Sequence, residues 1–375
     1  MVHICDKFGM RGSTVHGASR LFSWWMPRFD REKFNVKLYA LKRPDPSSRA
    51  LEAEGIPVLY LGKSAPNPTA LLAFLRVIGR EQADILHLHG WISANYGRVA
   101  GRLARIPTIM HEHGAHPSVP KVQQIADRLL ARFTHTAVAV SKAGYDFLVE
   151  KRFVSPSLIR IIFNGAPIEE FAPADPDAAA EEKTRLGIPP GGPVVGSVGR
   201  LDVEKGISYL LQAAKRVLVQ VPDARFVIVG DGPKREEFEA EARDLGIRRS
   251  TIFTGFRSDV PLLQSLMDVQ VFASLWDGAP LTAFEAMATG RAVVTTSVGG
   301  LAEIFEDGRT ALVVPPADPQ AMADAIIRML TDHTLAAELA SNAGAASAKY
   351  DIAQTVRNLE SLYQELYDGK RTASA

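Results

Sequence analysis

The stretch that decides the fold is Val269-Gln-Val-Phe-Ala-Ser-Leu-Trp-Asp-Gly-Ala-Pro-Leu-Thr-Ala-Phe-Glu-Ala-Met-Ala288. It opens with an apolar run, Val269–Phe272, whose length and β-branched residues are typical of a buried strand. Gly278 supplies a turn, Pro280 suits the first position of a helix, and the pattern from Leu281 to Ala288 is helical. The stretch therefore predicts a strand, a turn and a helix in close succession, as in the repeating unit of a parallel sheet.

The same alternation of short apolar runs and longer amphipathic segments covers both halves of the chain. In the first half we expect strands at Val2–Asp6, Val36–Tyr39, Val58–Tyr60, Ile85–His89, Thr108–His111, Ala137–Val140 and Ile159–Phe163. In the second half we expect them at Val194–Val198, Ala224–Val229, Thr251–Thr254, Val269–Phe272, Ala292–Thr295 and Ala311–Val314. Two such blocks predict an α/β protein with two doubly wound, Rossmann-like domains, which bind ligands at the carboxyl ends of their strands.

A segment rich in Ala, Pro, Asp and Gly, Phe171–Pro193, separates the two blocks. We expect a linker there, with one short helix near Ala178–Leu186. The first domain is then residues 1–172 and the second is residues 190–351. A final helix, Ile352–Tyr367, is expected to pack back on the first domain and to end in a frayed polar tail.

The composition is that of a globular protein, and its charge excludes a typical nucleic-acid-binding domain. The formal net charge is only +1, whereas such domains carry a strong basic excess. Cys5 is the only cysteine, so an intrachain disulfide is impossible and a reducing compartment is expected. No apolar run approaches the roughly 18 residues of a transmembrane helix, and Asp6, Lys7 and Arg11 interrupt any signal-like stretch. We therefore expect a cytoplasmic protein.

The start of the helix Leu281–Ala288 is a candidate phosphate site, because its amino end is expected at the carboxyl edge of the sheet. Thr282 adds a hydroxyl there. Glu285 shares a face of the helix with Leu281 and Thr282, one turn below the phosphate, where a carboxylate suits the hydroxyls of a ribose. Asp277, before the turn, can accept hydrogen bonds from a sugar. The alternatives are a helix cap at Asp277 and a solvated surface acid at Glu285.

A second candidate for anion binding is the loop Gly199-Arg-Leu-Asp-Val-Glu-Lys-Gly206, which follows the strand Val194–Val198. Arg200 and Lys205 place two cations in this loop, and the glycines at its ends let the backbone bend tightly. Arginine and lysine together make a suitable clamp for a diphosphate. The alternative is a solvated turn with a weak local pair between Glu204 and Lys205.

Together these stretches resemble glycosyltransferase family 4, the large retaining family with the GT-B fold, in which two Rossmann-like domains face each other across a cleft. Four motifs match the family pattern in the right order. They are Gly199-Arg-Leu…Glu204-Lys-Gly206, Val229-Gly-Asp-Gly-Pro233, the acid pair Asp277…Glu285, and Val298-Gly-Gly…Glu303…Asp307-Gly308…Pro315. The resemblance is dense in the second domain and loose in the first. Asp277 departs from it, because glutamate is commoner there, and this leaves the donor sugar open.

The resemblance implies a role for each matching residue of the second domain. Arg200 and Lys205 would hold the diphosphate and stabilise its charge as the glycosidic bond breaks, and Thr282 would contact the phosphate. Glu285 would bind the ribose, and Asp277 the transferred sugar. The other residues implied to surround the nucleotide and the sugar are Gly232, Pro233, Phe256, Arg257, Gly278, Ala279, Pro280 and Leu281.

In the first domain the resemblance rests on Pro107-Thr-Ile-Met-His-Glu-His-Gly114, which is similar to the family's strand ending in a His-Gly pair. His113 would face the anomeric carbon from across the cleft, with His111 as an alternative assignment. Gly17, in a loop where the family usually has a Gly-Gly pair, would approach the phosphates. The pair Asn164-Gly165 resembles the family's interdomain crossover.

Paired histidines on two strands also raise the possibility of a metal site, with His87, His89, His111 and His113 as ligands. The resemblance argues against it, because the family does not bind its diphosphate through a metal. We expect neither a metal nor any other cofactor.

The resemblance implies a retaining hexosyltransferase that moves sugar from a UDP- or GDP-sugar to an acceptor hydroxyl by front-face displacement. The expected acceptor is a sugar or a lipid-linked sugar, in polysaccharide or glycolipid assembly. The alternative is an isomerase on the same fold, similar to a nucleotide-sugar 2-epimerase. The segment Phe22-Ser-Trp-Trp-Met26 lies between Arg20 and Arg28. It either docks onto the inner face of a membrane or, as we favour, packs on the first sheet.

Overall fold

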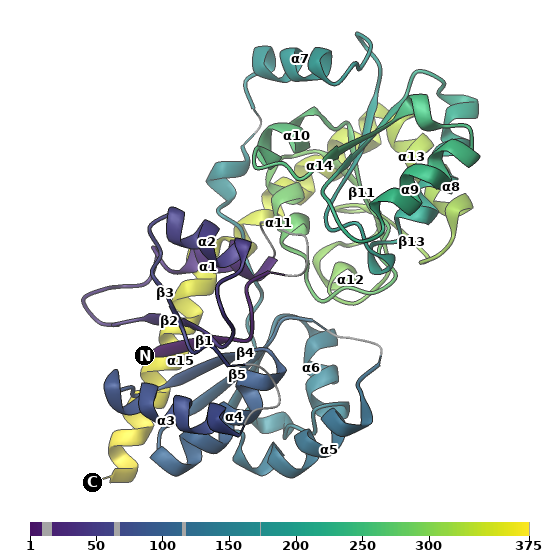
Figure 1. The fold of residues 1–375 in the computed structure, drawn as a ribbon. Coiled ribbons are helices and arrows are strands. Elements are labelled where there is room, and N and C mark those ends of the chain that lie inside the picture. Colours follow the sequence, from purple (N-terminus) through teal and green to yellow (C-terminus); the bar gives the residue numbers. More distant parts are fainter. Residues whose placement is uncertain (10–16, 64–67, 115–117, 173, 375) are drawn as a thin grey trace. The chain divides into compact units, whose positions relative to one another are not determined.

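The computed structural model describes residues 1–375 except 10–16, 64–67, 115–117, 173 and 375. The chain forms two compact units (Figure 1). The first comprises residues 1–164 together with 352–375, and the second comprises residues 165–351. The chain therefore passes from the first unit to the second between Asn164 and Gly165.

The first unit contains a seven-stranded parallel sheet with the order β3-β2-β1-β4-β5-β6-β7. Its strands are β1 (Val2–Cys5), β2 (Lys37–Ala40), β3 (Val58–Tyr60), β4 (Leu86–His89), β5 (Thr108–Glu112), β6 (Thr136–Ala139) and β7 (Ile159–Ile161). Its helices are α1 (Gly17–Trp25), α2 (Pro46–Ala53), α3 (Thr69–Arg80), α4 (Trp91–Ala104), α5 (Lys121–Leu130), α6 (Lys142–Glu150) and α15 (Ile352–Ser374). Each strand lies at or within two residues of its predicted position.

The two faces of the first sheet differ in chemistry because successive side chains of a strand point to opposite faces. Ile4, Leu88 and Met110 lie side by side in the register and belong to one apolar core. The opposite face carries His3 beside His87, and its histidines are covered by aromatic side chains of α1 and α15. This polar layer inside the protein follows from histidines at alternate positions of neighbouring strands.

Helix α1 confirms the favoured expectation for its segment, and helix α15 corrects another expectation. Phe22, Trp25 and Met26 are almost fully buried, so docking of this segment onto a membrane is wrong, and it packs in the first unit. Helix α15, yellow in Figure 1, continues to Ser374, where a frayed tail after Tyr367 was expected. It packs in the first unit, where Glu360 accepts a hydrogen bond from the backbone N–H of Asp30 (2.7 Å).

The second unit contains a six-stranded parallel sheet with the order β10-β9-β8-β11-β12-β13. Its strands are β8 (Val194–Val198), β9 (Arg225–Val229), β10 (Thr251–Gly255), β11 (Val269–Phe272), β12 (Ala292–Thr296) and β13 (Leu312–Val314). Its helices are α7 (Pro176–Arg185), α8 (Ile207–Gln220), α9 (Arg235–Asp244), α10 (Val260–Leu266), α11 (Leu281–Ala288), α12 (Leu301–Ile304), α13 (Pro319–Thr331) and α14 (His333–Ser347).

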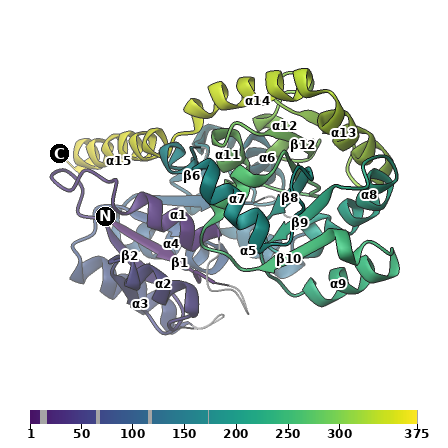
Figure 2. The same cartoon turned by 90° about the horizontal axis from the view of Figure 1, so that it is seen from above.

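Apolar strand residues and the inner faces of the helices build the core of this unit. Phe226 and Val271 of the sheet belong to one cluster with Leu210 of α8 and Ile326 of α13, two helices that pack side by side (Figure 2). Helix α7 packs on α10, and Ile188 is buried against Val227 and Leu266. The segment 171–193 is therefore part of the second unit, and its interpretation as a linker is wrong.

Within the described ranges, no helix combines the length and the apolar character needed to cross a bilayer.

Candidate functional site

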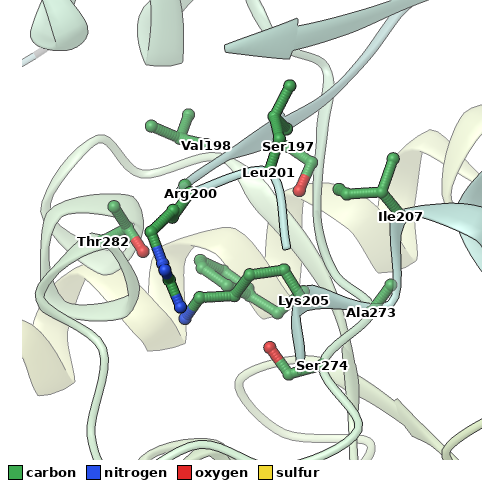
Figure 3. Close-up of a pocket in the computed structure, with 11 residues that line it drawn as sticks. Ser197, Val198, Arg200, Leu201, Lys205, Ile207, Ala273, Ser274 and Thr282 are labelled. Atoms are coloured by element: carbon green, nitrogen blue, oxygen red, sulfur yellow. The ribbon is translucent and has the colours of Figure 1, made fainter. Parts of the chain in front are cut away.

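A pocket of the second unit lies where β8 and β11 end (Figure 3). Arg200 and Lys205, from the loop after β8, line it together with Ser274, after β11, and Thr282, in the first turn of α11. Since β8 pairs directly with β11 and the chain order reverses there, this is the topological switch point at which doubly wound sheets bind ligands. The structure thus brings the two predicted cations and the predicted hydroxyl together in one pocket.

Both cations are held by carboxylates. Lys205 Nζ lies 2.5 Å from Asp277 Oδ2, which also accepts a hydrogen bond from Ser274 Oγ (3.2 Å). Arg200 lies 2.8 Å from Asp202 and 3.0 Å from Glu204. The expected alternative, a local pair between Glu204 and Lys205, is therefore wrong. The pair of Lys205 and Asp277 joins the loop after β8 to the turn before α11.

The amino end of α11 is open to a ligand. Pro280, in an extended conformation, stands one position before the helix and not at its first position, and no described side chain caps the helix there. The alternative of a cap at Asp277 is thus excluded, because that carboxylate faces Lys205. Glu285 is 0 % exposed, which excludes a solvated surface acid. Backbone N–H groups of the first turn therefore point toward the pocket with the positive end of the helix dipole.

Two close backbone approaches shape this end of the sheet. A Cβ atom on Gly299 would lie 1.9 Å from the carbonyl oxygen of Asp277. The Val298-Gly-Gly turn therefore packs directly against the backbone of the segment before α11. A Cβ atom on Gly232 would lie 2.3 Å from the carbonyl oxygen of Leu201. The predicted loop of Gly232 and Pro233 therefore packs directly on the loop that carries Arg200.

The other predicted donor-binding residues lie in the same unit. Ala279 is buried, Gly278 lies in the turn before it, and Leu281 is the first residue of α11. Phe256, after β10, is 44 % exposed. The guanidinium of Arg257 binds Asp259 and also Glu182 of α7 (3.0 Å). The hydrogen bond with Asp259 raises the pKa of Arg257 above its ordinary value.

The two predicted site residues of the first unit lie on separate elements. Gly17 begins α1, and His113 follows β5. His113 is half-buried, whereas the alternative, His111, is 3 % exposed inside the sheet. His113 is therefore the histidine of this strand that a ligand can reach.

Two residues that the sequence analysis missed, His3 and Tyr363, join the four predicted histidines. Hydrogen bonds connect His3 with His89 (3.0 Å) and His87 with Tyr363 (2.8 Å). Ring nitrogens of two triads, His3 with His87 and His89, and His89 with His111 and His113, lie within 4.8 Å of one another, close enough to hold a metal ion. Burial lowers the pKa of His3 to about 3. Only the His-x-Cys pattern of β1 hinted at His3, and no local signal identified Tyr363.

Comparison with protein families matches both parts of the chain. Residues 179–346 match the model of glycosyl transferases group 1, and residues 15–170 match that of glycosyltransferase family 4.

Curated relatives agree over most of the chain. It is 35 % identical over 305 residues to the alpha-D-kanosaminyltransferase of Streptomyces kanamyceticus, covering 76 % of this chain and 78 % of the relative. It is 32 % identical over 327 residues to a D-inositol 3-phosphate glycosyltransferase of Corynebacterium urealyticum, covering 79 % and 74 %. It is also 29 % identical over 276 residues to the UDP-Gal:alpha-D-GlcNAc-diphosphoundecaprenol alpha-1,3-galactosyltransferase of Escherichia coli, covering 71 % of each.

Solved structures share the fold across nearly the whole chain. Anabaena Alr3699/HepE, crystallised with UDP-glucose, has a TM-score of 0.82 at 23 % identity, covering 97 % of this chain and 99 % of that one. The sucrose-phosphate synthase of Thermosynechococcus elongatus has a TM-score of 0.77 at 20 % identity, covering 98 % and 99 %. The predicted GT-B class is confirmed, and the chain belongs to glycosyltransferase family 4.

Proposed function

We propose that this glycosyltransferase is a retaining hexosyltransferase that uses a UDP- or GDP-sugar. The observation that supports it most is the pocket in which Arg200, Lys205 and the amino end of α11 at Thr282 converge. Two cations and a helix amino end form a site suited to a diphosphate. In this proposal the buried carboxylate of Glu285, one turn further along α11, accepts hydrogen bonds from the ribose hydroxyls.

The reaction in this proposal is a front-face displacement. The bond between the anomeric carbon and the β-phosphate oxygen breaks, and a bond from that carbon to the acceptor oxygen forms on the same face. The acceptor proton passes to an oxygen of the departing phosphate. Arg200 and Lys205 stabilise the charge that develops on the diphosphate, so no metal is required. Asp277, held by Lys205, accepts hydrogen bonds from the transferred sugar. His113 is the residue of the first unit that we assign to the sugar.

The remaining predicted residues complete the donor site in this proposal. Gly232 and Pro233 border the nucleotide, and Phe256 and Arg257 lie beside the base. Gly17 is the residue of the first unit that we assign to the phosphates. The residues that hold the sugar through their backbone are Gly278, Ala279, Pro280 and Leu281.

The acceptor in this proposal is a sugar or a lipid-linked sugar. The relative from Escherichia coli is named for a UDP-galactose donor and a diphosphoundecaprenol-linked acceptor, which supports testing both first. We place the reaction in the cytoplasm, at the inner face of the membrane where the acceptor is lipid-linked, and in polysaccharide or glycolipid assembly.

The test is a thermal-shift screen of UDP- and GDP-hexoses, since a bound donor raises the unfolding temperature by mass action. Active donors are then incubated with and without sugar and undecaprenol-linked acceptors, with EDTA present. We expect nucleotide release and a glycoside whose anomeric configuration, read by NMR, is that of the donor. An inverted product contradicts the retaining mechanism. Conversion of donor alone into an epimer identifies an isomerase instead.

A further inference from the structure

Six buried or half-buried groups of the first unit form one continuous chain of hydrogen bonds. We call it the histidine chain, and it runs in the order His113, His89, His3, Tyr363, His87, His111. The successive donor–acceptor distances are 2.9, 3.0, 3.3, 2.8 and 2.9 Å. It therefore connects His113, the predicted sugar-facing histidine, with Tyr363 of α15, which lies 250 residues later in the sequence.

The rings are arranged as two stacked rows. His89 is nearly coplanar with His3 (8°) and with His113 (21°), at centroid separations of 5.2 Å, so their nitrogens meet edge to edge. The second row stacks on the first, with His111 over His113 at 4.2 Å and 10°. Two nitrogens on one tetrahedral zinc would lie about 3.3 Å apart and converge on the ion. The shorter, in-plane contacts favour N–H···N hydrogen bonds over metal ligation.

All buried members of the chain are neutral near pH 7. Burial lowers the pKa of His87, His89 and His111 well below the ordinary value of 6.5, and that of His3 to about 3. A neutral imidazole has one donor and one acceptor, and a buried phenol between two rings donates to one and accepts from the other. Each group then donates once, so all five bonds must point the same way along the chain.

The end at His111 decides the direction. Its Nε2 is buried and has no hydrogen-bond partner among the described residues, and the same holds for Nε1 of Trp25, whose ring centroid is 5.5 Å away. The indole nitrogen is always a donor. A proton on His111 Nε2 would therefore add a second buried donor without a partner beside the indole N–H of Trp25. Buried N–H groups without a partner are rarer than buried acceptors without one. The proton of His111 therefore belongs on Nδ1, which donates to His87.

We propose that the histidine chain fixes His113 as the Nδ1–H tautomer, with Nε2 accepting from His89, so that Nδ1–H is the proton offered to the donor sugar. The role toward the sugar rests on the proposed function, but the tautomer does not. Tyr363 is a positioning residue in this proposal. Its hydroxyl accepts a hydrogen bond from His87 and donates one to His3, so it joins the two rows of rings and keeps all the hydrogen bonds in the same direction.

The test is NMR of the full-length protein labelled with ¹⁵N-histidine, with the signals of His113 assigned by difference from His113→Gln. We expect a protonated Nδ1 on His113 in the wild type. Tyr363→Phe removes only the linking hydroxyl, and we expect mixed tautomers at His113 and about a tenfold lower kcat with an unchanged KM for the donor. Tyr367→Phe, on the same helix, is the matched control.

A protonated Nε2 on His113 in the wild type would overturn the proposal, as would an unchanged tautomer in a folded Tyr363→Phe variant. Stoichiometric zinc bound to the purified protein and lost in His89→Gln would overturn it too. The wild-type spectrum needs no turnover. Absence of transferase activity with a protonated Nδ1 would therefore refute the proposed function and leave the tautomer standing.

A second, independent observation concerns the outer face of α5. Val122, Ile125 and Leu129 recur at helical spacing and are 74 %, 61 % and 62 % exposed, and Leu103 of the neighbouring helix α4 is 60 % exposed. We call these four residues the α5 surface. Three large apolar side chains on one face of one helix form a stripe that is unusual on a protein surface exposed only to water.

The charges around the α5 surface have one sign. The segments that carry it expose cations at Arg102, Arg105, Lys121, Arg128 and Arg132. Between residues 98 and 133 the sequence has only two acids, and neither balances them. Asp127 is fully buried between Arg98 (2.8 Å) and Arg152 (2.7 Å), and Glu112 also binds Arg152. An apolar stripe whose own segments expose cations and no unpaired acid is complementary to an anionic lipid surface.

We infer that the α5 surface docks on an anionic phospholipid bilayer, with its apolar side chains at the acyl boundary and the arginines at the headgroups. This inference deepens the proposed function, since it would bring the enzyme to a lipid-linked acceptor. In this inference the α5 surface contacts the membrane. The segment Phe22–Met26, which the sequence suggested for that contact, has its aromatic side chains in the core.

The test is sedimentation of the full-length protein with phosphatidylcholine vesicles, with and without phosphatidylglycerol. We expect binding only with the anionic lipid, weakened by salt. The triple variant Val122→Ser, Ile125→Ser and Leu129→Ser should bind about tenfold more weakly, yet transfer sugar normally to a water-soluble acceptor. Val219→Ser, at an 82 % exposed position of α8, is the control.

The inference would be overturned if the triple variant bound the anionic vesicles as tightly as the wild type, or if the wild type did not bind them. A concentration-dependent dimer that the triple variant loses would instead assign the α5 surface to a second copy of the chain. Loss of transfer to the soluble acceptor by the wild type would contradict the proposed function and not the docking.

Discussion

Lys205 and Asp277, 72 positions apart in the sequence, are joined by an ion pair in which Nζ lies 2.5 Å from Oδ2. The pair connects the loop after β8 with the turn before α11. It also joins two groups to which we assign different parts of one donor, the diphosphate and the sugar. Each residue of the pair thus holds the other in place.

The first prediction concerns the two cations of the pocket. Arg200→Ala and Lys205→Ala should each weaken the binding of UDP or GDP by about 10- to 100-fold, because a charge-assisted hydrogen bond contributes roughly 1.5–3 kcal/mol. Isothermal titration calorimetry measures this directly. Lys215→Ala and Arg216→Ala, at exposed positions of α8, control for the loss of positive charge. Equal affinities in all four variants would remove the assigned diphosphate site.

The second prediction concerns Glu285 and the ribose. Wild-type protein should bind UDP more tightly than its 2′,3′-dideoxy analogue, because the buried carboxylate loses its partners when the hydroxyls are absent. Glu285→Gln should bind UDP more weakly by roughly 1.5–3 kcal/mol and should discriminate less between the two nucleotides, because a neutral amide is a weaker acceptor than a carboxylate. An unchanged thermal midpoint shows that the variant is folded. Discrimination that the substitution leaves unchanged would place the ribose elsewhere.

The third prediction concerns the support beneath Asp277. Gly299 has a φ of 47°, and a Cβ atom there would lie 1.9 Å from the Asp277 carbonyl oxygen. Gly299→Ala should therefore displace the segment that carries Asp277, lowering kcat and costing about 1–3 kcal/mol of stability. Gly308→Ala is a matched control, since Gly308 also has a positive φ of 67° but no described atom within 4 Å of the added Cβ. Equal effects of the two variants would show that backbone strain alone is responsible.

The sequence predicts best what depends on local pattern and parallel topology. Val194–Val198 and Val269–Phe272 are strands with the predicted bounds, because apolar β-branched runs of this length have few alternatives. The convergence of Arg200 with Thr282 was predictable for a related reason. Adjacent parallel strands place the loops after their carboxyl ends at the same edge of a sheet.

What the sequence does not predict depends on contacts between distant elements. Tyr363 meets His87 across 276 positions, and no local pattern marks either residue for the other. The segment 171–193 has the composition of a linker, but Ile188 finds a hydrophobic partner in Val227 and becomes core. The pair of Lys205 and Asp277 was missed for the same reason. Both residues were identified singly, while their contact is a property of the fold.

The last prediction is that the first unit loses stability as the pH falls below about 6.5. His3, His87, His89 and His111 have folded-state pKa values below the ordinary 6.5, because burial disfavours the charged ring. Unfolding exposes them, so the unfolded chain binds more protons than the folded one below pH 6.5. The stabilisation is complete above that pH and decreases through the acid range, down to about pH 3 for His3.

Each of the four buried histidines should contribute a slope of roughly 1.4 kcal/mol per pH unit once the pH is well below 6.5. The measurement is the urea midpoint between pH 7.5 and about 5.5, above the range in which carboxylates titrate, followed by the fluorescence of Trp24 and Trp25, both buried in the first unit. His3→Gln should reduce the slope by one proton, whereas His333→Gln, at an exposed position of the second unit, should leave it unchanged. A midpoint independent of pH would mean that these histidines have the same pKa values in the folded protein as in the unfolded chain. The hydrogen-bond chain would then break below about pH 6.5, because an imidazolium has two donors and no acceptor.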